Sequence, residues 1–151
     1  MSWAPRNNPA LLNYEHGRFI DPKQAKLVRG FMLVAYLAKL RRLTKLNLPG
    51  VGFDETGLAQ VSALKGLNQL RLDHTRIIGA DMKHLQGLSA LKELDLSSTS
   101  IRDAGLENLK GLKSLRVLWV INTRVTAAGV NNLKQAIPGL SVRDWNGEFR
   151  R

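Results

Sequence analysis

Residues 91–112, LKELDLSSTSIRDAGLENLKGL, contain the pattern from which the fold of this chain can be predicted. It opens with apolar residues at its first, fourth and sixth positions, and the last two of these alternate with a polar residue as in a strand. Leu106, Leu109 and Leu112 then recur every three residues, which is close to the helical period. The stretch therefore predicts one short strand followed by one short helix.

The same pattern occurs four times, at intervals of 24 residues. The strand segments begin at Leu43, Leu67, Leu91 and Leu115. The helical segments carry apolar residues at three matching positions: Leu58, Met82, Leu106 and Val130; Val61, Leu85, Leu109 and Leu133; Leu64, Leu88, Leu112 and Ala136. Because no unit can bury both of its apolar sides alone, the units must stack on one another. Stacked strands of this kind form a parallel sheet, with neighbouring strands ~4.8 Å apart.

This arrangement resembles the leucine-rich repeat family over residues 43–136, in the bacterial-type and ribonuclease-inhibitor-like variants that have a short convex helix. The resemblance implies an α/β fold, a short solenoid with a concave parallel sheet of about five strands, convex short helices and an N-terminal helical cap. Thr75, Thr99 and Thr123 occupy the place where many family members carry Asn or Cys. Val51 breaks this column, so we expect any hydroxyl ladder to be incomplete in the first unit.

The ends of the solenoid need caps, because an uncapped end exposes a slice of the core. Asp21-Pro22 is typical of a helix start, so we predict a helical cap over residues 21–42, in the place of the convex helix of a unit that has no strand. Residues 1–20 are predicted to be an extended arm, residues 43–145 the solenoid and residues 146–151 a tail. The segment 137–142 is predicted to be the fifth strand, with Trp145 and Phe149 covering the last core layer.

Length and composition narrow the class of protein. The 151 residues suit one domain, and the absence of cysteine excludes disulfides and thiolate metal sites. The longest apolar run, residues 31–38, is much shorter than the ~20 residues of a membrane-spanning helix. The N-terminus has no apolar signal-peptide core. We therefore expect an intracellular protein, cytoplasmic or organellar rather than secreted, without a transmembrane segment.

The net charge of +11 is unevenly distributed. Residues 1–42 hold eight Lys and Arg against two acids, and residues 108–143 contain no acid. A basic patch is predicted on the cap and first strand, comprising Lys26, Arg29, Lys39, Arg41, Arg42 and Lys45. Such a patch is either a solvated surface or a contact for RNA phosphates, an anionic membrane surface or an acidic protein.

The outward positions of the predicted strands align into columns across the sheet. One column contains Arg71, Asp95 and Trp119, and Glu93 lies in the column before it. Val117, Trp119 and Ile121 place an apolar patch on a face where the pattern calls for polar residues. Either the arm, the tail or self-association covers this patch, or it is a hot spot for a partner.

Catalytic and cofactor chemistry has weak support. The carboxylates of Asp73, Glu93 and Asp95 are expected to form salt bridges with interleaved Arg and Lys rather than an acid–base pair. The glycine-containing segment 50–57 has neither dinucleotide nor P-loop spacing, and the repeat already explains a turn there. His16, His74 and His84 fall in places that cannot converge on a metal. We therefore predict no enzyme activity, catalytic residue, cofactor, metal or small-molecule substrate.

The sequence favours an adaptor module, a subunit or accessory factor of a larger assembly, that binds another protein on its concave face. The area buried against the partner would come from Val117, Trp119 and Ile121. The orientation of the partner would be fixed by polar contacts with Arg71, Glu93 and Asp95. The alternative is an RNA-contacting subunit of a ribonucleoprotein that uses its basic ends. A third reading is assembly into a large membrane or organellar complex through an apolar cap helix.

Overall fold

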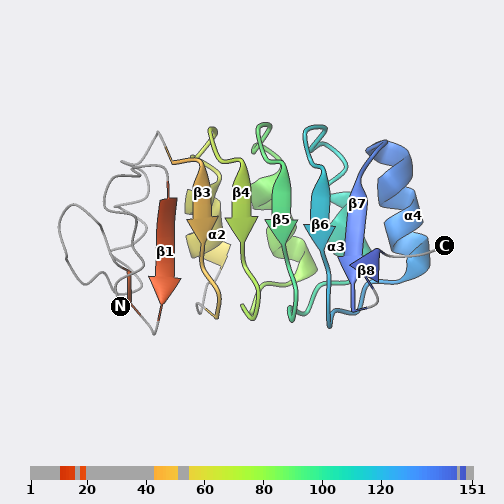
Figure 1. The fold of residues 1–151 in the computed structure, drawn as a ribbon, viewed down its shortest axis with the longest axis horizontal. Coiled ribbons are helices and arrows are strands. Elements are labelled where there is room, and N and C mark those ends of the chain that lie inside the picture. The colour runs from red at the N-terminus through yellow and green to blue at the C-terminus, as the bar shows by residue number, and fades with distance from the viewer. Residues whose placement is uncertain (1–10, 16–17, 20–42, 51–54, 146, 149–151) are drawn as a thin grey trace.

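The computed structural model describes residues 11–15, 18–19, 43–50, 55–145 and 147–148 (Figure 1). Its strands are β1 (Leu11–Glu15), β2 (Arg18–Phe19), β3 (Lys45–Asn47), β4 (Gln69–Arg71), β5 (Glu93–Asp95), β6 (Val117–Trp119), β7 (Ser141–Asp144) and β8 (Gly147–Glu148). Its helices are α2 (Glu55–Val61), the 3₁₀ helix η1 (Gly79–Leu85), α3 (Asp103–Glu107) and α4 (Ala127–Ala136). From β3 to β7, strands and helices alternate as the repeat predicts.

All the strands form a single sheet in the order β2-β1-β3-β4-β5-β6-β7-β8. The five strands predicted from the repeat, β3 to β7, run parallel and in register, with equivalent residues of successive units paired. Helices α2 and α3 lie behind the sheet and α4 lies beside its β7 end, so the opposite face is free of described helices (Figure 1). We call that face the open sheet face.

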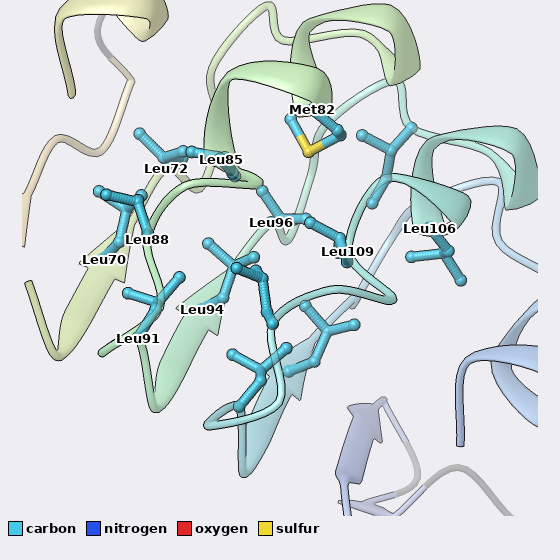
Figure 2. Close-up of a cluster of buried hydrophobic side chains, with 14 of the residues drawn as sticks. Leu70, Leu72, Met82, Leu85, Leu88, Leu91, Leu94, Leu96, Leu106 and Leu109 are labelled. Carbon is cyan, nitrogen blue, oxygen red and sulfur yellow. The ribbon is translucent and has the colours of Figure 1, made fainter. Parts of the chain in front are cut away.

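The core fills the space between the sheet and the helices (Figure 2). All the repeat positions named above are buried except Ala136, which is only partly buried. Ile137, which follows Ala136 at the end of α4, is 1% exposed and supplies the missing apolar volume. A further inward position that we did not predict, between strand and helix, carries Ile77 and Ile101, which are buried, and Val125, which is partly buried.

The turn after each strand is built in the same way in successive units. Thr75 Oγ1 donates to the backbone oxygen of Leu72 at 2.6 Å, and Thr99 and Thr123 make the equivalent bonds to Leu96 and Val120. The hydroxyl contacts predicted for this column are therefore present, each within its own unit, whereas Val51 lies outside the described residues. The residue before each threonine has a left-handed backbone: His74, Ser98 and Asn122 have φ of 59°, 55° and 53°.

The N-terminal part differs from the prediction. We expected an arm and a cap unit without a strand, but β1 pairs in parallel with β3, with Leu12 opposite Leu46, and β2 turns back antiparallel to β1. The sheet therefore extends past the first repeat. The predicted helical cap, residues 21–42, lies outside the described residues, and with it all the basic patch except Lys45, which is exposed on β3.

At the C-terminal end a fifth parallel strand is present, but β7 spans Ser141–Asp144 rather than the predicted 137–142. The predicted role of Trp145 is also wrong. Trp145 is 77% exposed and does not cover the core. The reason is that the chain turns at this residue into β8, which pairs antiparallel with β7. Phe149 lies outside the described residues.

Candidate functional site

The register of the sheet brings the predicted central column together. Arg71 pairs with Asp95, Asp95 with Trp119, and Trp119 with Arg143. The sequence predicted the first three of these neighbours. Arg143 was not among the predicted neighbours, although it lies 24 residues after Trp119 and so keeps the period of the repeat.

Arg71 lies between two carboxylates at the middle of the sheet. Its Nε is 3.5 Å from Asp73 Oδ1 and 3.5 Å from Asp95 Oδ2. The Arg71 side chain is 47% exposed, whereas the Asp73 and Asp95 side chains are 11% and 13% exposed. The expected salt bridges are therefore present, and one guanidinium serves two largely buried acids.

The other polar groups of this region are held by short hydrogen bonds. Gln69 Nε2 donates to Glu93 Oε2 at 2.7 Å, between neighbouring strands. The backbone N–H of Ser97 donates to Asp95 Oδ1 at 3.0 Å and fixes that carboxylate. Because Gln69 and Asp95 are held in this way, the polar part of the face has a defined shape.

A shallow pocket of about 260 Å³ opens at this place. It is lined by Gln69, Leu70, Arg71, Asp95 and Trp119, so it crosses the three central strands β4, β5 and β6 (Figure 1). Leu70 and Trp119 are the apolar lining residues, and Arg71 and Asp95 are the charged ones.

The predicted apolar patch continues from the pocket along β6. Val117, Trp119 and Ile121 are each partly exposed, and none of them belongs to the core between the sheet and the helices. Their position on the open sheet face follows from Leu118 and Val120, which alternate with them and are buried. Indole and branched aliphatic side chains in this state can still lose solvent-exposed area to a partner.

The described residues contain no grouping of three His, Asp or Glu side chains that could hold a metal ion. His74 Nδ1 lies 3.2 Å from Asp73 Oδ2 in the turn after β4, and His84 belongs to η1 on the helical side. His16 is outside the described residues. Gly50, the start of the glycine-containing segment, has φ of 67° and takes the same turn position as His74, Ser98 and Asn122.

The basic side chains near the C-terminal end are mostly exposed, but some of them are engaged. Lys113 Nζ donates to the backbone oxygen of Ala136, and Arg116 Nη1 donates to two carbonyl oxygens of its own loop. Arg124 and Arg143 are exposed, without an ion pair or side-chain hydrogen bond to another described residue. No helix in the described part of the chain is long and apolar enough to cross a membrane.

Sequence reasoning missed two contributors to this site. Asp73 was placed near the carboxylate pair but was not chosen, although it is 8% exposed and contacts Arg71. Gln69 was aligned in its column without a role, although it lines the pocket. The position of each residue in the aligned columns of outward positions could have indicated both residues. That position predicts which side chains are neighbours, but it does not predict how deeply a side chain is buried.

Comparison with known proteins supports the fold. Residues 65–124 match the family model described as leucine rich repeat. Comparison with curated protein sequences gives no match.

Three solved structures illustrate the likeness. Internalin C2 from Listeria monocytogenes is 22% identical with a TM-score of 0.59, over 72% of this chain and 44% of internalin C2. A leucine-rich-repeat protein of Leptospira interrogans is 17% identical with a TM-score of 0.53, over 70% of this chain and 26% of that one. A chain of the Chaetomium Mex67:Mtr2 subunits is 19% identical with a TM-score of 0.55, over 79% of this chain and 91% of that one. At these identities the likeness shows the repeat solenoid, and this chain spans less than half of the two bacterial proteins.

Proposed function

Because this chain belongs to the leucine-rich repeat family, we propose that it is a non-enzymatic, intracellular interaction module, a subunit or accessory factor of a larger assembly. Its binding surface is the open sheet face around Trp119. Repeat solenoids present extended surfaces for binding, and the likeness to a chain of the Mex67:Mtr2 subunits agrees with a role within a complex.

One observation carries the proposal: Val117, Trp119 and Ile121 lie side by side on the face of the sheet that no described helix covers. A partly exposed Trp beside aliphatic residues is typical of the centre of a protein–protein interface. Arg71, Glu93 and Asp95, one or two strands away, supply the polar groups that would fix the orientation of a partner. The basic patch around Lys45 would steer encounter rather than hold the complex.

The test is capture of partners from a native extract by the wild-type protein and by two variants. Trp119→Ala should weaken retention of the partner by about 2 kcal/mol or more, which is roughly 30-fold in Kd. Ile78→Ala is the matched control, because Ile78 is 51% exposed and lies at the start of η1 on the helical side. A partner retained equally by both variants contradicts the proposal.

A second candidate, an RNA-contacting accessory subunit, is supported by the exposed Arg124 and Arg143 in a region that holds few acids. The dependence of binding on salt concentration distinguishes the two candidate functions. Binding through several phosphate contacts falls log-linearly and steeply with salt concentration, whereas binding through an apolar patch changes little. Capture that resists high salt and nuclease supports the protein-binding module, and capture lost under both conditions supports the RNA-contacting subunit.

A further inference from the structure

The segments that run from the end of each helix into the next strand lie along one edge of the solenoid, where strands β4 to β7 begin (Figure 1). At equivalent positions of the four units they are residues 62–68, 86–92, 110–116 and 134–140. They carry six basic residues and no acid: Lys65, Lys92, Lys110, Lys113, Arg116 and Lys134. We call this part of the surface the basic edge.

The opposite edge of the solenoid, where the strands lead into the helices, has a different charge pattern. Its acids lie among its bases: Asp73, Asp81 and Asp103 with Arg76, Arg102 and Arg124. Asp81 and Asp103 accept hydrogen bonds from backbone N–H groups at the starts of η1 and α4. The four segments of the basic edge hold no such acid, so their positive charge is not balanced within them.

Several cations of the basic edge are held in place by backbone oxygens. Lys65 Nζ donates to Gly87 in the following segment at 3.2 Å, and a Cβ at Gly87 would collide with this ammonium. Lys113 Nζ donates to Ala136 of the next segment at 2.8 Å, and Arg116 Nη1 donates to two oxygens of its own segment. An ammonium has three N–H donors and a guanidinium has five, so each group keeps donors for an anion.

The cations follow one another along the edge as a row. The backbone N–H of Lys92 donates to Asn68, and that of Arg116 donates to Lys92, so equivalent positions of successive units lie at the strand spacing of ~4.8 Å. Four segments at this spacing make a row roughly 14 Å long. Lys110 pairs with Glu107 at 2.6 Å. Four other cations have no ion pair with a described residue: Lys65, Lys92, Lys113 and Arg116.

The residues between these cations offer little to a protein or to a lipid bilayer. Apart from Pro138, the exposed and partly exposed ones are Ser, Ala, Gly, Asn and Gln. Protein interfaces depend on aromatic and aliphatic anchors, and helices that lie on a membrane insert Trp, Phe or Leu. Proteins that bind single strands stack the bases on aromatic side chains, which these four segments lack. The basic edge therefore suits a partner that presents only a line of negative charges.

We propose that the basic edge binds the phosphate backbone of duplex nucleic acid without reading its sequence. Each strand of a duplex presents a phosphate every ~3.4 Å along the axis, and phosphate contacts position a protein without specifying bases. The inference goes beyond the proposed function, because the basic edge is separate from the open sheet face. It also lies apart from Arg124 and Arg143, which support the second candidate function.

The test is titration of the full chain with a labelled duplex of mixed sequence at a series of salt concentrations. Lys92→Gln combined with Arg116→Gln removes two neighbouring cations of the row. We expect binding in low salt to weaken about tenfold or more. We also expect the slope of log K against log salt to become shallower by about 2, since each phosphate contact contributes about 0.9.

The matched control is Arg76→Gln combined with Arg102→Gln, which removes the same charge from exposed positions on the opposite edge. It should leave the slope unchanged. Thermal unfolding of each double variant checks that the fold is kept. If Lys92→Gln with Arg116→Gln does not fold, Lys65→Gln with Lys92→Gln replaces it, with the same expectation.

An equal change of slope in both double variants would overturn the inference, because net charge alone would then explain binding. Tighter binding to polyglutamate, to vesicles containing phosphatidylserine or to oligouridylate than to the duplex would overturn it as well. Trp119→Ala should leave duplex binding unchanged while it weakens capture of the protein partner. The proposed function and this inference can therefore fail separately.

Discussion

Gly105→Ala tests the contact between repeat units on the helical side. Gly105 lies within α3, and a Cβ at this position would sit 2.9 Å from Gly79 Cα in the preceding unit. Such a separation is far below ordinary van der Waals contact, and the obstructing atom belongs to the backbone, so it cannot rotate away. The two units would have to move apart.

The magnitude follows from two opposing terms. Replacing Gly by Ala in an unhindered helix stabilises it by roughly 0.5–1 kcal/mol. Overpacking of a tight contact costs about 1–3 kcal/mol. We expect the clash to dominate and the free energy of unfolding to fall by about 1–2 kcal/mol, with Tm lower by about 2–8 °C for a chain of this size.

The assay is urea unfolding of the wild type, Gly105→Ala and Gly111→Ala in parallel. Gly111 is the matched control, because a Cβ there meets nothing within 4 Å. Its substitution should change the free energy of unfolding by only about 0–1 kcal/mol, toward greater stability. If Gly105→Ala proves as stable as Gly111→Ala, the close approach of α3 to Gly79 is refuted.

Three further substitutions test individual features of the fold. Thr99→Val removes the hydroxyl that donates to the backbone oxygen of Leu96 and should lower the free energy of unfolding by about 1 kcal/mol; an unchanged value in urea unfolding would mean that the turn does not depend on this bond. Ser98→Gly relieves a left-handed backbone at φ of 55° and should raise Tm slightly, since a non-glycine residue there costs roughly 1 kcal/mol; a lower Tm would refute that reading. Trp145→Ala should change the free energy of unfolding by less than about 0.5 kcal/mol because the side chain is 77% exposed, and a larger loss would restore a core-covering role.

The repeat period explains how much of the fold the sequence could predict. Leu70, Leu94 and Leu118 are fully buried at paired positions of neighbouring strands, as equal spacing requires. Strand β1 was not predicted, because Leu12 pairs with Leu46, which lies 34 residues later and therefore outside the 24-residue period. Periodicity specifies contacts between equivalent residues, and β1 has no equivalent.

The candidate site was predicted in part for the same reason. The neighbours Arg71, Asp95 and Trp119 follow from the period, and the structure places them around one pocket. The burial of Asp73 and the exposure of Trp145 depend on how single turns pack, and no repeat pattern encodes that.

Site-specific photo-crosslinking in a native extract shows whether the partner binds the open sheet face. A photoreactive phenylalanine analogue replaces Trp119 of β6 in one protein and Ile78, at the start of η1, in another, so that the probe lies on the sheet side or on the helical side. We predict that the partner forms a crosslink from position 119 and none from position 78. A crosslink to the same partner from position 78 alone would place the binding surface on the helical side and contradict binding on the open sheet face.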